Sequence, residues 1–160
     1  MVADRVAEFL DDFDRLGWES EPSAKMPEFV SDPELRLLFV RGMLQRLKKT
    51  ATFFDAALSF LTLDEFAMVI DDAVQLMNDS PESRDEVAGS VIAYASLQCP
   101  QLLTRYLSKL WNLDPNSKTY YQEYPWRGAD SVEIARLVEI VDSSDEAQEK
   151  LRACECLLEA

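Results

Sequence analysis

The chain contains no histidine, and this absence removes the commonest routes to side-chain catalysis. Without an imidazole, neither a Ser-His-Asp nor a Cys-His arrangement can be built. Glycine is also scarce, with 4 in 160 residues, and neither a Walker-type phosphate loop nor a G-x-G-x-x-G motif occurs. We therefore expect no catalytic residues and no cofactor, and we predict that the protein is not an enzyme.

The sequence offers equally little for a metal ion. Its 3 cysteines follow no zinc-binding spacing, and ferritin-like di-iron sites need histidine. Cys154 and Cys156 are two residues apart in a helical pattern, which is poor geometry for a disulfide. Asp64 and Asp71 share one helix face and leave a carboxylate-dependent metal site open as an alternative. A solvated outer face is the simpler interpretation, and we predict no metal site.

Long apolar runs are absent as well. No stretch approaches the roughly 20 apolar residues that span a bilayer, and the first residues, MVADRVAEFLDD, lack the pattern of a signal peptide. With 48% hydrophobic and 29% charged residues, the composition is typical of a single folded domain over residues 1–160. We expect a soluble, cytoplasmic protein that does not bind membranes.

Basic residues are outnumbered, with 16 Lys and Arg against 30 Asp and Glu, a formal net charge of −14. Nucleic-acid binding draws much of its affinity from neutralising phosphates, so we expect no nucleic-acid partner. Another protein is the expected partner, and a cationic one would be attracted over a distance. The basic residues concentrate in one predicted helix, 33–49, which should pack beside the acidic helix predicted over 3–16.

Apolar residues recur at helical spacing along most of the chain, and no segment alternates convincingly like a β-strand. Asp32 before Pro33 marks one helix start, and the capping boxes TLDE, DSVE and SSDE mark three more. Three helical hairpins are predicted after the two N-terminal helices of 1–49. They cover 51–61 with 63–78, 81–98 with 100–111, and 131–142 with 145–159.

The last hairpin is predicted to bury one apolar stripe from each helix. The residues expected inside are Ile134, Leu137, Val138 and Val141 on the first helix, and Leu151, Cys154, Leu157 and Leu158 on the second.

The recurring hairpins of 51–160 resemble a HEAT-like or armadillo-like α-solenoid. The resemblance implies a stack of helix pairs with an extended surface for binding other proteins. The predicted fold class is therefore all-α, with about eight helices in antiparallel hairpins. An α-solenoid and an irregular helical bundle both remain open as its architecture.

One connection, over 112–129, has no helical period and contains the stretch TYYQEYPWRG at 119–128. Its aromatic and arginine side chains are of the types enriched at interface hot spots, although such aromatics also seal cores. The candidate partner-binding residues are Tyr120, Tyr121, Tyr124, Trp126 and Arg127. The stretch can therefore be a partner interface or a plug that seals the core, and both interpretations stay open. We expect Trp126 to point inward and Tyr120 and Arg127 to point outward.

The sequence therefore predicts a non-enzymatic protein–protein interaction module with an acidic surface and an aromatic loop. An immunity or antitoxin-type protein that neutralises a basic toxin is one alternative, because its charge would speed the encounter. A carboxylate-dependent metal-binding enzyme is the other.

Overall fold

The computed structural model describes residues 2–16, 26–46, 52–79, 85–112 and 125–160. Within these ranges the chain is helical and has no β-strand, which confirms the predicted all-α class. The α-helices are α1 (Val2–Leu16), α2 (Met26–Ser31), α3 (Arg36–Arg46), α4 (Thr52–Leu58), α5 (Leu63–Asp79), α6 (Asp85–Gln98), α7 (Leu107–Trp111), α8 (Ser131–Ser143) and α9 (Ala147–Glu159). The described ranges also contain the short 3₁₀ helices η1 (Pro100–Leu102), η2 (Thr104–Tyr106) and η4 (Pro125–Gly128).

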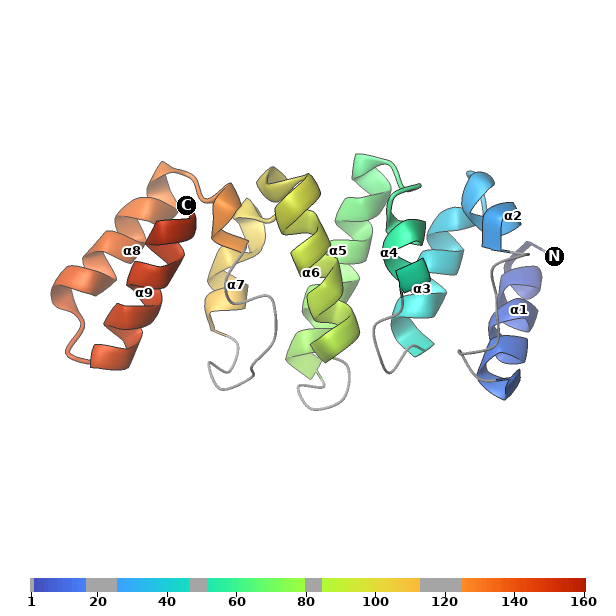
Figure 1. Ribbon diagram of the computed structural model, residues 1–160, viewed down its shortest axis with the longest axis horizontal. Helices are drawn as coiled ribbons and strands as arrows, with labels where there is room; N and C mark the ends of the chain where they lie inside the picture. The colour runs from blue at the N-terminus through green and yellow to red at the C-terminus, as the bar shows by residue number, and fades with distance from the viewer. Residues whose placement is uncertain (1, 17–25, 47–51, 80–84, 113–124) are drawn as a thin grey trace.

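The helices form an elongated row that follows chain order, with α1 at one end and the α8–α9 pair at the other (Figure 1). The closest pairs are α8 with α9 and α5 with α6. The predicted 131–142/145–159 hairpin is therefore present. In the middle of the chain the pairing differs from the prediction, because α5 packs chiefly against α6 and also contacts α3.

The segment 100–111, predicted as one short helix, consists of η1, η2 and α7. Its first turns are closed by bonds between residues three apart, as from the Leu103 N–H to the Pro100 carbonyl at 2.9 Å. The close approach of η4 accompanies this tighter winding, since the Thr104 hydroxyl bonds the Gly128 carbonyl at 2.5 Å.

Side-chain caps begin several of these helices. Thr62 and Glu65 form the predicted reciprocal capping box at the start of α5. The Asp32 carboxylate accepts from the Glu34 N–H at 2.9 Å within a turn, and α3 begins at Arg36, three residues after the predicted start at Pro33. The SSDE prediction was wrong in detail. The helix α9 begins at Ala147, and its N-terminal turn is held instead by the Ser144 hydroxyl, which accepts from the Glu146 N–H and donates to the Glu149 carboxylate.

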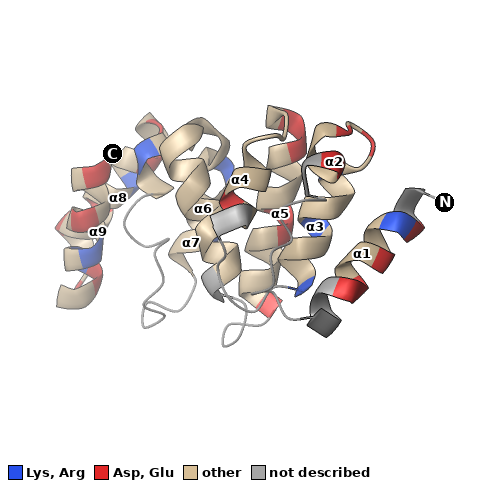
Figure 2. Cartoon of the chain, turned by 45° about the vertical axis from the view of Figure 1, so that its right-hand side comes forward, with Lys and Arg blue, Asp and Glu red and all other residues tan. Residues whose placement is uncertain are grey.

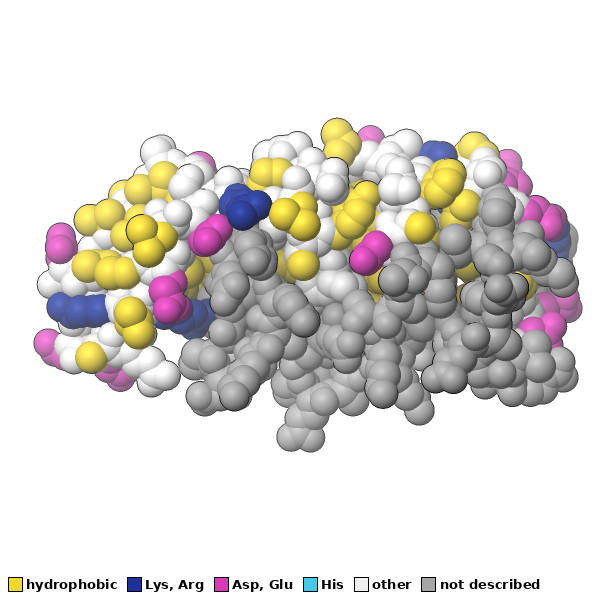
Figure 3. All heavy atoms as spheres, in the orientation of Figure 1, with side chains coloured by type: hydrophobic (Ala, Val, Ile, Leu, Met, Phe, Trp, Pro, Cys, Tyr) yellow, Lys and Arg dark blue, Asp and Glu magenta, His cyan; other side chains and the backbone are white. Residues whose placement is uncertain are grey.

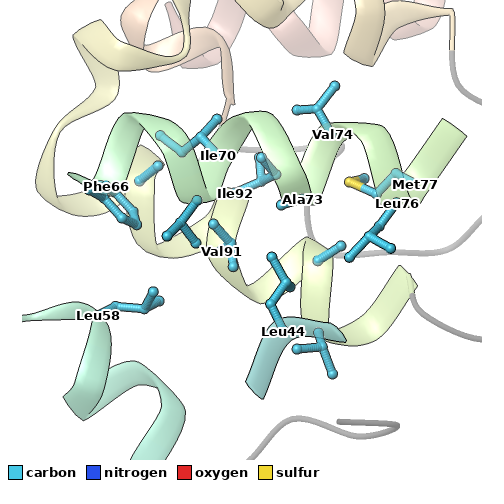
Figure 4. Packing of buried hydrophobic residues seen from close by; sticks show 14 of the residues in the cluster. Leu44, Leu58, Phe66, Ile70, Ala73, Val74, Leu76, Met77, Val91 and Ile92 are labelled. Atoms are coloured by element: carbon cyan, nitrogen blue, oxygen red, sulfur yellow. The ribbon is translucent and has the colours of Figure 1, made fainter. Parts of the chain in front are cut away.

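One hydrophobic core runs through the row. The helix α5 contributes most to it, and Figure 4 shows its inner side chains facing Val91 and Ile92 of α6, with Leu44 of α3 and Leu58 of α4 nearby. The buried residues of α5 are Phe66, Val69, Ile70, Ala73, Val74, Leu76 and Met77. Their spacing is the i, i+3, i+4, i+7 stripe expected from the sequence.

The arginines of α3 are neutralised within the chain. The helix packs beside α1, as predicted from their opposite charges, and it also contacts α5 (Figure 2). The ion pairs are Arg36–Glu65 at 2.9 Å, Arg41–Asp72 at 2.5 Å and Arg46–Asp11 at 2.5 Å. These ion pairs link α3 to α1 and α5. Each arginine of α3 is therefore paired with a carboxylate of a neighbouring helix.

Candidate interaction site at the C-terminal hairpin

The predicted partner-binding residues fall into two groups. Tyr120, Tyr121 and Tyr124 lie outside the described residues. Trp126 and Arg127 belong to η4, which joins the body of the protein to the α8–α9 hairpin. Trp126 is only 1% exposed, which confirms that it points inward, and Arg127 is exposed.

Trp126 anchors the hairpin to the body. Its indole N–H donates to Oε1 of Glu133 at 3.0 Å, and its ring meets Trp111 of α7 edge to face, with centroids 6.0 Å apart. Such aromatic pairs contribute beyond the apolar area that they bury. A buried indole also needs a partner for its N–H, and the first turn of α8 supplies one.

Glu133 is a buried carboxylate whose role the sequence did not reveal. Its backbone N–H bonds the Asp130 carboxylate at 2.9 Å, as a capping box predicts, but its own carboxylate binds Trp126 and Arg136. Burial raises the pKa of Glu133, but the hydrogen bonds from Arg136 and Trp126 outweigh this effect, so the pKa lies below its ordinary value. Glu133 is therefore charged in the folded protein at neutral pH.

This network predicts a measurable pH dependence. Because the pKa of Glu133 is lowered on folding, its stabilising contribution is complete above the ordinary value of 4.5 and is lost as the pH falls through the folded value. Glu133→Gln should be less stable than wild type near neutral pH, and the difference should shrink in acid. Urea unfolding from about pH 7 down to about pH 3.5 measures it. The exposed Glu139 of the same helix is the control, since Glu139→Gln should leave the acid dependence unchanged. A constant Glu133→Gln difference across this range would contradict the assignment.

The Trp111 ring makes cation–π contacts with one arginine from each helix of the hairpin. The guanidinium carbon of Arg152 lies 4.3 Å from its ring centroid, and that of Arg136 lies 5.0 Å away. Arg152 also donates to the Leu110 carbonyl at 3.4 Å. These cation–π contacts hold α8 and α9 against α7. A more exposed pair, Arg127 with Glu159 at 3.4 Å, adds a weaker link from η4 to the end of α9.

Most of the apolar side chains expected inside the hairpin face outward, so that prediction was wrong. Leu137 is fully buried, and Val141 and Leu157 are partly buried. The exposed members are Ile134 at 37%, Val138 at 44%, Leu151 at 60%, Leu158 at 87% and Cys154. The reason is packing: α7 and η4 cover one side of the hairpin, and within the described residues these five side chains lie away from that contact. Figure 3 shows hydrophobic side chains gathered at this end of the molecule.

A groove of about 310 Å³ lies between α7 and α9, beside these exposed side chains. Trp111 and Leu151 give it apolar walls. Its other lining residues are Glu146, Gln148, Glu149, Arg152 and Glu155. The groove therefore joins apolar surface to a predominantly acidic edge.

Two absences hold within the ranges that the structure describes. None of their helices combines the length and the apolar character that a membrane crossing requires. Nor do these ranges contain a group of three or more Cys, Asp or Glu side chains placed to hold a metal ion.

Comparisons with protein-family models, curated proteins and solved structures give no significant match. The row of helices fits a helical-repeat arrangement loosely, and no finding assigns it to the HEAT or armadillo families.

Proposed function

We propose that this chain is a non-enzymatic protein–protein interaction module that docks its partner on the outer face of the α8–α9 hairpin. The observation that carries the proposal is the set of apolar side chains exposed there. They are Ile134, Val138, Leu151 and Leu158, four of the ten large apolar residues that are exposed in the described ranges.

Single exposed apolar residues are normal on soluble proteins, but a gathered set is typical of an interaction surface. Leu151 and Leu158 are seven residues apart, so they lie two turns apart on one stripe of α9. Burying one such side chain contributes roughly 1.5–3 kcal/mol. A partner that covers the stripe would remove this apolar surface from water and so gain binding free energy.

The contacts between η4 and the α8–α9 hairpin favour a binding role over a catalytic one. Glu133, the most buried charged group of the hairpin, is held by Trp126 and Arg136 and serves to position the hairpin. The net charge of −14 favours cationic partners, a class that includes the basic toxins neutralised by immunity-type proteins. The tyrosines of 119–128 remain predicted contacts for the same partner.

Capture of binding proteins from cells that make this chain tests the proposal. Leu151→Ser with Leu158→Ser should remove the partner recovered by wild type and leave the melting temperature within a few degrees, since both side chains are already exposed. The matched control is Leu63→Ser with Leu97→Ser, which alters two leucines exposed by 58% and 61% elsewhere. Equal recovery by wild type and the hairpin variant would contradict the proposal.

A further inference from the structure

The α7–α9 groove has a charge pattern that selects one kind of occupant. Glu146 lines it from the N-cap of α9 and Glu155 from within the helix, with Leu151 between them in sequence. Within the described part of the chain, neither carboxylate has a hydrogen-bond or ion-pair partner. Glu149 accepts from Ser144, and the one lining cation, Arg152, is drawn to the Trp111 ring at 4.3 Å. The carboxylates of Glu146 and Glu155 are therefore available to cationic groups of a bound ligand.

The apolar part of the surface has the form that a helix would cover. Leu151, Cys154 and Leu158 make an exposed stripe over two turns of α9, and the groove runs beside it past Trp111. Amphipathic helices dock on such surfaces through side chains spaced three, four and seven residues apart. A docked helix would also extend the row in which the helices of this chain already lie side by side (Figure 1).

From this we infer that the groove and the Leu151–Leu158 stripe bind a basic amphipathic helix of a partner protein. The inference rests on the proposed interaction function and names the chemistry of the partner. Leucines or similar residues of the helix would lie on Leu151 and Leu158, and its lysines or arginines would reach Glu146 and Glu155. These two carboxylates are nine residues apart, or about 13–14 Å along α9. One cation of the ligand would therefore lie before Leu151 and the other between Leu151 and Leu158.

A second copy of this chain is a poorer occupant. Each copy carries a net charge of −14, so two copies repel one another. The carboxylates of the groove would also meet an acidic surface in such a pair, whereas a basic helix supplies the complementary charge.

The test uses a fluorescein-labelled synthetic helix of about 18 residues, with a leucine stripe flanked by lysines. Fluorescence anisotropy in about 50 mM salt should show saturable binding to the full chain. Binding should be roughly tenfold weaker for Glu146→Gln with Glu155→Gln, the loss expected from two exposed ion pairs. It should also weaken for Leu151→Ser. A peptide with glutamates in place of the lysines should not bind.

The matched control is Glu8→Gln with Glu34→Gln, which removes the same charge from exposed positions on α1 and before α3. This variant should bind the basic peptide within about twofold of wild type, since its carboxylates are remote from the groove. Equal weakening by both pairs would show attraction to net charge alone and would overturn the inference. So would absent binding, equal binding of the acidic peptide, or a concentration-dependent dimer in sedimentation that Leu151→Ser abolishes.

The two proposals fail in different ways. If the cellular partner is lost with the leucine variants but kept by Glu146→Gln with Glu155→Gln, the hairpin is the docking site and the basic-helix inference is wrong. If the leucine variants keep the partner, the interaction function proposed for the hairpin fails.

Discussion

Replacing Trp126 with alanine should lower the free energy of unfolding by about 3–5 kcal/mol, the largest single effect that we expect in this chain. The indole is 1% exposed, packs edge to face on Trp111 and donates a hydrogen bond to the buried Glu133. Its removal leaves a cavity and takes one partner from a buried carboxylate. Urea unfolding followed by circular dichroism measures the loss.

Trp126→Phe separates these two causes. It keeps a ring in the core but removes the N–H donor, while Arg136 still holds Glu133. We expect an intermediate loss of about 1–3 kcal/mol. A loss below about 0.5 kcal/mol for Trp126→Ala would be typical of a surface residue and would contradict the anchor role.

Gly128→Ala is expected to cost about 2–3 kcal/mol through a clash with backbone. An added Cβ would lie 2.0 Å from the carbonyl oxygen of Pro100 and 2.6 Å from its carbon. Because these are main-chain atoms, η4 and η1 would have to separate, and the Thr104 hydrogen bond to the Gly128 carbonyl would be strained. The melting temperature and urea midpoint of the variant measure this effect.

Gly42 provides the matched control. A Cβ there would also be too close to a neighbour, at 2.3 Å, but that neighbour is Cδ1 of Leu10, the tip of a flexible side chain. Gly42 lies inside α3, where alanine gains roughly 1 kcal/mol of helix propensity. Gly42→Ala should therefore change stability by less than about 1 kcal/mol. Equal losses at the two glycines would contradict the close packing of η4 on η1.

The two large effects share one cause. Trp126 and Gly128 belong to the same short helix, and both fix the place of the α8–α9 hairpin against the body. Trp126 is buried and Gly128 has no side chain, so their part in binding is indirect. They hold in position the surface that we propose for docking.

Local patterns in the sequence predicted much of this fold. The stripe of α5, the capping box of Thr62 and Glu65 and the pairing of basic α3 with acidic α1 all follow from neighbouring residues or from simple charge. The inward direction of Trp126 was also predicted, from the tendency of aromatic side chains in such a connection to seal a core. Such features depend on residue types and their local spacing, which can be read from a single sequence.

The exposed hairpin could not be predicted in this way. Periodicity shows that Leu151 and Leu158 share one apolar stripe of a helix, but it does not show whether another element covers that stripe. That depends on which tertiary contacts the helix makes. The buried role of the Glu133 carboxylate could not be predicted for a similar reason. The sequence DSVE indicates only a capping box, and the contact of this carboxylate with Trp126 depends on the tertiary structure.

The thiol of Cys154 reports directly on the proposed docking face. It is exposed on the stripe between Leu151 and Leu158, whereas Cys99 and Cys156 are buried. Burial raises the pKa of the Cys99 thiol, and it raises the pKa of Cys156 to about 12. Iodoacetamide at about pH 8 should therefore modify Cys154 selectively in the folded protein.

The proposed docking function requires a protein partner to cover the outer face of α9. The rate of Cys154 alkylation, read by mass spectrometry with and without a saturating amount of the partner captured by wild type, tests this requirement. We predict that the bound partner slows this reaction by roughly tenfold or more, because it excludes the reagent from the stripe. An unchanged rate at saturation would contradict the proposed docking.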